Sequence, residues 1–108
     1  MSNLDQLKVS KKDALEAIEL AEALEALQKN KHYKLVFEKE LFQDFAAQCV
    51  LAKGANGTQN EKAQAAIDRD IQMIGGLNSR LHSILAIGAN AKVALGDIDA
   101  ELSLEMES

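Results

Sequence analysis

The chain has 108 residues, of which 47% are hydrophobic and 27% charged, which argues against a wholly disordered chain and predicts a single helical domain over residues 1–108. Proline is absent, aromatic residues are few, and Ala, Leu, Glu and Lys are abundant, which favours an all-α fold over β-sandwiches and barrels. The whole net charge of −5 lies in the acidic tail, residues 97–108, so nucleic-acid binding, which usually needs a basic domain, is not expected.

The single cysteine fits a reducing compartment, and the hydropathy of the chain favours the cytosol. Cys49 is the only cysteine, so an intramolecular disulfide cannot form. Residues 1–5 lack the apolar run of a signal peptide. No stretch approaches the roughly 18–20 uncharged apolar residues that span a bilayer. We therefore expect the protein to be made and to stay in the cytosol, without membrane contact, unless an assembly carries it out.

The first helix is predicted to follow a short irregular start. Residues 1–9 show no clear period, and we expect a loose lead-in there. Ser10 is a candidate N-cap, with Asp13 three residues later in the acidic position of a capping box. From Asp13 to Leu27 nearly every residue is a strong helix former. Asn30 can adopt the left-handed conformation that often ends a helix, so we expect it to close this one.

A second amphipathic helix is predicted from about His32 to Lys53, where apolar residues recur at spacings of three and four. All four aromatic residues of the chain lie between Tyr33 and Phe45, so this segment is expected to fill the hydrophobic core. The loop that follows is short. It should fold Phe45 back against Ile67–Ile74 in an antiparallel hairpin. Leu35 and Val50 lie on the apolar line of this helix, and Val36 joins an apolar cluster at its start.

The loop is predicted at Gly54–Gln59, and either Thr58 or Asn60 should cap the next helix. From about Asn60 to Leu104 a helical period continues without interruption by proline. It slips slowly backwards, which indicates left-handed supercoiling. Gly75-Gly76 lies within it, and we expect a kink or a close backbone crossing there. The apolar line is Ile67, Ile71, Ile74, Leu77, Leu81, Ile84, Leu85, Gly88, Ala91, Leu95, Ile98 and Leu102.

The length of this helix predicts either a break at Gly75-Gly76 or contacts between chains, and we favour the contacts, with a modest bend at the glycines. About 40 residues at a rise of ~1.5 Å make a rod near 60 Å, whereas a compact globule of this size is only ~34 Å across. We therefore expect an elongated helical hairpin, with two to three shorter helices against one long C-terminal helix, that forms a homo-oligomer. The residues predicted to meet another chain are Leu81, Leu85, Gly88, Ala91, Leu95, Ile98 and Leu102.

The residues that carry chemistry in other proteins form no recognisable constellation. His32, His82 and Cys49 have no partners at metal-ligand spacing. Gly75-Gly76 follows no strand and precedes no Lys-Ser/Thr pair, so it is neither a dinucleotide fingerprint nor a phosphate loop. Lys29–Lys34 is a basic cluster with Tyr33, but lysines at a helix end already have a structural explanation. We expect no enzyme activity, cofactor, metal or small-molecule substrate.

Two segments of the chain carry recognisable packing motifs. In Leu24–Leu35, spaced leucines precede an Asn-Lys-His-Tyr-Lys run. Ile67–Leu81 has the pattern Ile-x-x-x-Ile-x-x-Ile-Gly-x-Leu. Together these segments resemble small helical proteins of tailed bacteriophages, in which Phe more often stands at the place of Tyr33. The resemblance implies a virion or virion-assembly protein that contacts other virion proteins, in the host cytoplasm or within the particle. It supplies no catalytic residue.

A regulator that binds and inhibits a host protein through the acidic tail is the alternative function. Residues 97–108 hold five acids and no base. Like charges repel along a helix. We therefore expect the tail to fray in the isolated protein, and to be ordered by a basic partner or a neighbouring subunit.

Overall fold

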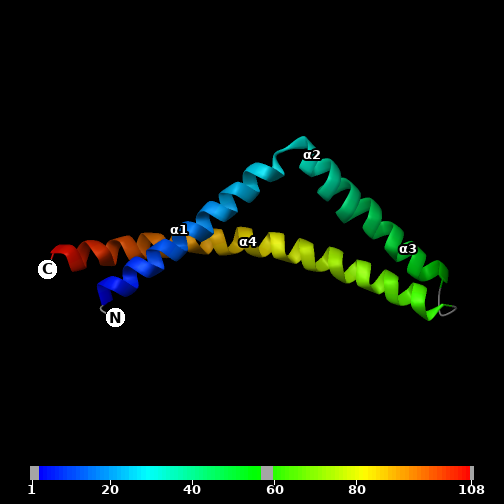
Figure 1. Ribbon diagram of the computed structural model, residues 1–108. Helices are drawn as coiled ribbons and strands as arrows, with labels where there is room; N and C mark the ends of the chain where they lie inside the picture. Colours follow the sequence, from blue (N-terminus) through cyan, green and yellow to red (C-terminus); the bar gives the residue numbers. More distant parts are fainter. Residues whose placement is uncertain (1–2, 57–59, 108) are drawn as a thin grey trace. The chain divides into compact units, whose positions relative to one another are not determined.

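The computed structural model describes residues 3–56 and 60–107, and nearly all of them are helical. Because α2 (Lys31–Tyr33), η1 (Lys34–Phe45) and α3 (Ala46–Asn56) follow one another without a break, the described chain consists of three helical segments. The all-α fold and the long C-terminal helix are therefore confirmed. The elements are α1 (Asn3–Gln28), α2 (Lys31–Tyr33), η1 (Lys34–Phe45), α3 (Ala46–Asn56) and α4 (Glu61–Glu107), coloured from blue to red in Figure 1.

The contacts divide the chain into two compact units. Unit 1 joins α1, as far as Ala26, to α4 from His82 onward. Unit 2 runs from Leu27 to Leu81. The division follows from the 47 residues of α4, which offer α1 a neighbour along the C-terminal part and the α2–α3 segment a neighbour along the N-terminal part. The single domain expected from the chain length stays a prediction.

α1 begins at Asn3, so the expectation of a loose lead-in over residues 1–9 is wrong for its described part. Leu7, Ala14 and Ala21 recur every seven residues and are buried, and this stripe starts before the predicted helix start. Ser10 is an exposed position inside the helix rather than its N-cap. The first nine residues show no period by themselves, but Leu7 continues the stripe of the helix that follows.

Asn30 starts the second helical segment instead of ending the first in a left-handed conformation. Its backbone is extended, with φ −71° and ψ 133°. Its side-chain oxygen accepts hydrogen bonds from the N–H groups of His32, at 2.8 Å, and Tyr33, at 3.4 Å. Because Asn is common at both ends of helices, its identity alone did not decide between the two caps.

The middle of the second segment, η1, has the wide turns of a π-helix, where the sequence predicted an α-helix. π-helical hydrogen bonds join residues five apart, which makes side chains at that spacing neighbours. The rings of Phe37 and Phe42 lie 6.5 Å apart between centroids, and Lys39 Nζ lies 3.3 Å from Asp44 Oδ2. Both pairs are five residues apart. Phe37 also stacks on Tyr33, with 4.8 Å between centroids.

The core of unit 2 contains fewer buried aromatic rings than the sequence predicted. Tyr33, Cys49 and Ile74 are buried, whereas Phe37, Phe42 and Phe45 are only half-buried. An ion pair of 2.6 Å between Lys53 Nζ and Asp68 Oδ1 joins α3 to α4. This contact brings the two arms of the predicted hairpin together. The facing of Phe45 against Ile67–Ile74 stays a prediction.

α4 begins after Asn60, whose side-chain oxygen accepts hydrogen bonds of 3.1 Å from the N–H groups two and three residues later. Asn60 is thus the cap, and Thr58, the other candidate, lies outside the described residues. The predicted loop at Gly54–Gln59 is partly wrong, because α3 continues to Asn56. Glycine often ends a helix, but Gly54 keeps a helical backbone here.

α4 remains helical through Gly75 and Gly76, where a kink or a close crossing was expected. A Cβ on either glycine would meet no described atom within 4 Å, so no backbone crosses there. The close approach is at Gly88. A Cβ there would overlap the Cβ of Ala21 and lie 3.3 Å from the Ala17 carbonyl oxygen. In Figure 1, α1 crosses the orange part of α4.

The buried side chains of unit 1 are small. Three of the five buried apolar residues are alanines, and no large side chain of the described residues is fully enclosed. Burial of apolar carbon stabilises a fold by about 0.8 kcal/mol per CH2 group, so an alanine-rich core contributes little. The five residues are Leu7, Ala14, Ala21, Leu24 and Ala91.

The glycines of α4 should respond in opposite ways to alanine. Gly88→Ala should lower the free energy of unfolding by about 1–3 kcal/mol, because the added methyl overlaps Ala21 and forces the helices apart. Gly75→Ala and Gly76→Ala should raise it by about 0.5–1 kcal/mol each, because alanine is the better helix former and nothing obstructs its methyl. Urea melts of the three variants measure this, and a stabilised Gly88→Ala would contradict the crossing.

Candidate interaction surface

The residues that were weighed for chemistry lie on separate helical segments. His32 and His82 are exposed, and Cys49 is buried and free. Among residues 3–56 and 60–107, no three His, Cys, Asp or Glu side chains are placed to hold a metal ion. Within the same residues, no helix combines the length and the apolar character needed to cross a membrane.

The seven residues predicted to meet another chain all lie on the inward side of α4. Gly88 and Ala91 are buried, and the other five, Leu81, Leu85, Leu95, Ile98 and Leu102, are half-buried. At Gly88 the neighbour is α1 of the same chain. A stripe in the sequence does not distinguish a chain's own helix from a partner's helix. The contact of these seven residues with another chain stays a prediction.

One edge of the α1–α4 pair is closed by polar contacts. Lys11 Nζ lies 2.8 Å from Asp99 Oδ1, and Lys92 Nζ lies 4.0 Å from Glu22 Oε1. Lys11 and Glu22 are three helical turns apart, and so lie on one side of α1. Asp99 and Lys92 are two turns apart and share one side of α4. These pairs also show that the two helices run antiparallel.

The acidic tail forms part of this pair. α4 continues to Glu107, so residues 97–107 are helical, and the expected fraying of the tail in the isolated protein stays a prediction. Besides the Lys11–Asp99 ion pair, Asn3 Nδ2 donates a hydrogen bond of 2.9 Å to Glu105 Oε1. The antiparallel arrangement brings the start of α1, which is rich in lysine, next to the acidic end of α4. That opposite charge offsets the repulsion within the tail.

The other edge of the pair is an open groove of about 550 Å³, named here the α1–α4 groove. Ile87, which is 49% exposed, lies at this edge together with the polar Ser10, Asp13 and Asn90. Alanines lining both helices leave room for another backbone to come close. The other six lining residues are small or apolar: Leu7, Ala14, Ala17, Ala91, Ala94 and Ile98.

The charge along the α1–α4 groove is negative. Asp13 lines it, and none of the lining residues is basic. On α4, Asp97 and Glu101 follow Ala94 by one and two helical turns, so they continue the same side of the helix. A partner that enters this groove therefore needs apolar side chains flanked by positive charge.

Unit 2 exposes apolar residues in two adjacent pairs, Leu35-Val36 and Val50-Leu51. The sequence placed Leu35 and Val50 on the apolar line of the second helix and Val36 in an apolar cluster at its start, but Leu35 is 57%, Val36 53% and Val50 64% exposed. Neighbouring residues on a helix point about 100° apart, so both members of a pair do not enter one core. The adjacency of Leu35 and Val36 in the sequence could therefore have indicated that at least one of them is exposed.

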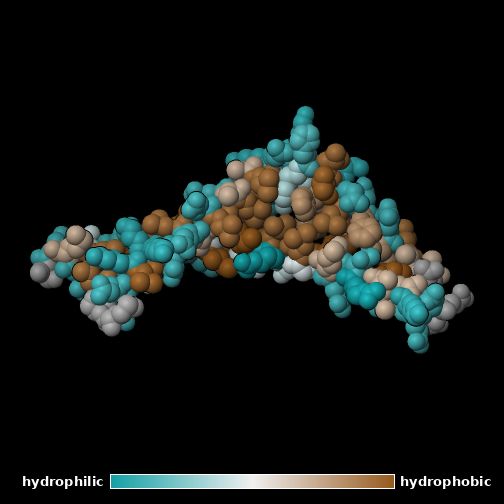
Figure 2. All heavy atoms as spheres, in the orientation of Figure 1, coloured by the Kyte–Doolittle hydropathy of each residue, from teal (hydrophilic) through white to brown (hydrophobic). Residues whose placement is uncertain are grey.

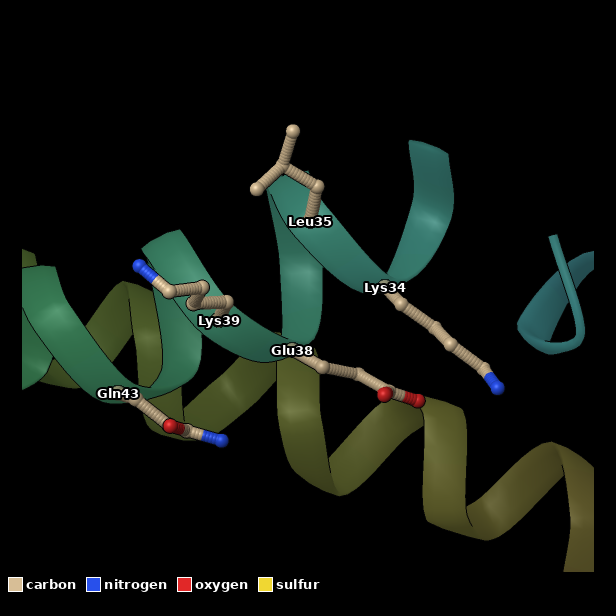
Figure 3. A pocket seen from close by; sticks show the side chains of 5 residues that line it. All are labelled: Lys34, Leu35, Glu38, Lys39 and Gln43. Carbon is tan, nitrogen blue, oxygen red and sulfur yellow. The ribbon is translucent and has the colours of Figure 1, made fainter. Parts of the chain in front are cut away.

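Leu35 lies among charged side chains on η1. Lys34, Leu35, Glu38, Lys39 and Gln43 line a shallow pocket. Figure 3 shows Leu35 pointing away from α4, with Lys34 and Lys39 on either side of it. Leu35 and its charged neighbours Lys34, Glu38 and Lys39 are named here the Leu35 face. It combines one exposed apolar side chain with a small excess of positive charge.

The two units differ in charge. Unit 1 holds four lysines and eleven acidic residues, which gives a net charge of −7. Unit 2 holds eight lysines and arginines and six acidic residues, which gives +2. The sequence placed the imbalance in the tail alone, because the charges of residues 1–96 cancel. When the residues are grouped by contacts, the negative net charge belongs to unit 1 as a whole and not to the tail alone.

Comparison with known proteins gives no relative from which to transfer a role. No family model, curated protein or solved structure matches the chain.

The Lys11–Asp99 contact should hold the tail in place. Lys11→Glu replaces an ion pair of 2.8 Å with two like charges, so amide hydrogen exchange at Asp97–Glu101 should accelerate roughly two- to fivefold. Lys12→Glu, which makes the same charge change at an exposed neighbour, is the matched control and should leave these amides nearly unchanged. Equal acceleration in both variants would show that net charge, and not this contact, orders the tail.

Proposed function

We propose that this protein is a non-enzymatic structural or particle-assembly protein of a tailed bacteriophage. It acts through helix-mediated self-association and through contacts with other virion proteins. The observation that carries the proposal is the exposure of many large apolar side chains on two units whose own cores are small. The proposed location is the host cytoplasm, and then the particle.

The size of each unit supports a need for partners. Each comprises about half of the 108 residues, and domains this small bury too little surface to be more than marginally stable alone. The buried apolar residues of unit 1 are mostly alanines, and those of unit 2 are Tyr33, Cys49 and Ile74. Association with another chain would add the apolar burial that each unit lacks.

The exposed apolar residues are large and numerous. Val93 is 71%, Leu104 68% and Met106 78% exposed on α4. Figure 2 shows apolar side chains reaching the surface between polar ones on the side in view. Apolar surface of this kind marks sites of protein–protein contact, which is how an assembly protein works.

The assignment to a phage depends on the resemblance of Leu24–Leu35 and Ile67–Leu81 to small phage proteins. In the structure these segments belong to the end of α1, the start of η1 and the middle of α4. Ile74 and Leu24 are buried there, so the motifs are packing motifs. They support a shared helical architecture and add no chemistry.

A regulator that inhibits a host protein is the second candidate. The net charge of −7 on unit 1 favours it, since such a surface suits a basic partner. The acidic surface would then extend beyond the tail, to α1. A host-protein inhibitor would be present in infected cells and absent from purified particles.

The purified protein should be a homo-oligomer at about 50 μM, within the ordinary affinity range. Exposed apolar surface drives the association, so the mass from sedimentation equilibrium should exceed the 11.7 kDa of the monomer and rise with concentration. A single species of monomer mass at this concentration would refute self-association.

The location of the protein separates the two candidates. Mass spectrometry of purified particles, from the phage that encodes this chain, should find it in a fixed ratio to the major structural proteins. Lysate from infected cells, depleted of particles, is the comparison sample. Recovery only from that lysate would favour the regulator.

A further inference from the structure

We propose that the α1–α4 groove of one copy binds the Leu35 face of a second copy of this chain. This proposal rests on the self-association proposed above, and it adds which two surfaces meet. It joins unit 1 of one molecule to unit 2 of the next. Because the two surfaces differ, the contact runs head to tail.

The shapes of the two surfaces suit a helix in a groove. The groove lies between two antiparallel helices, and Ala14, Ala17, Ala91 and Ala94 line it. Small residues on both helices let a third helix approach closely. η1 presents Leu35, which is 57% exposed, as the anchor for such a site.

The charges of the two surfaces are complementary. Asp13 lines the groove, and Asp97 and Glu101 continue its α4 side. The Leu35 face carries Lys34 and Lys39 beside Glu38, and Lys39 is also paired with Asp44, so Lys34 supplies most of its free positive charge. The attraction also follows the net charges of the units, −7 and +2. Such complementarity selects the partner and its orientation.

A symmetric contact between two grooves is disfavoured by the same charges. It would set Asp13 and the acids of α4 against the same residues of the other copy, with no base among the lining residues. Like charges brought together in an interface cost free energy and exclude that arrangement. The basic Leu35 face is therefore the better occupant.

A head-to-tail contact has a consequence for assembly. After two molecules bind, one keeps a free Leu35 face and the other keeps a free groove, so each can bind a further molecule. Such heterologous interfaces generate rings when the rotation closes, and open filaments when it does not. Both outcomes suit a protein that builds part of a particle.

Two single variants, each of which removes one side of the contact, provide the test. Ala94→Glu adds a carboxylate to the groove at an exposed position, and Leu35→Glu replaces the exposed anchor by an acid. Each variant alone should associate at least about tenfold more weakly than the parent in sedimentation velocity. An equimolar mixture should form a 1:1 heterodimer, because one intact groove and one intact Leu35 face remain.

The controls carry the same charge change elsewhere. Ala100→Glu, on α4 but outside the groove lining, and Ala47→Glu, on α3, are exposed positions and should associate like the parent. Circular dichroism of all four variants checks that the helices are kept.

Several outcomes would overturn the proposal. Parent-like association of Ala94→Glu would show that the groove is empty. Loss with Ala94→Glu but not with Leu35→Glu would indicate a groove-to-groove contact or another occupant. Loss in both without recovery in the mixture would exclude a head-to-tail contact. A monomeric parent would instead refute the self-association on which the proposal rests.

Discussion

The contact of Gly88 on α4 with Ala17 and Ala21 on α1 determines how unit 1 is built. A side chain at position 88 would overlap Ala21, so the two backbones approach as closely as they do because glycine stands there. Helices this close have room only for small residues between them, and Ala14 and Ala91 are buried beside the crossing. The same small side chains leave the groove open at one edge.

Electrostatics then sets the direction and the two edges of the pair. An antiparallel arrangement puts Lys11 beside Asp99 and Glu22 beside Lys92, so attraction closes one edge. These pairs are exposed, and each contributes at most about 1 kcal/mol. They use half of the four lysines of unit 1. The excess of acids that remains gives the other edge, with its groove, a negative field.

Periodicity made part of this fold predictable. Every member of the apolar line of α4 is buried or half-buried. Residues three and four apart lie on one face of a helix, and that face of α4 points inward along its 47 residues. The site was less accessible to sequence reasoning. Gly75, Gly76 and Gly88 look alike in the sequence, and only the position of α1 shows which one is needed. Leu35 fitted a stripe drawn with α-helical spacing. η1 is a π-helix, so that spacing does not hold there.

The small cores and the exposed apolar groups both affect the free energy of folding. The cores bury little apolar carbon, and the exposed groups could be buried by a partner. Conformational entropy opposes the ordering of every residue, and units of half this chain bury little apolar carbon against it. A partner that binds only the folded helices adds burial and shifts the equilibrium toward them in proportion to its concentration. For a chain that associates with itself, that concentration is its own. Folding and assembly would then be a single linked equilibrium, with the acidic groove and the basic Leu35 face deciding which surfaces meet.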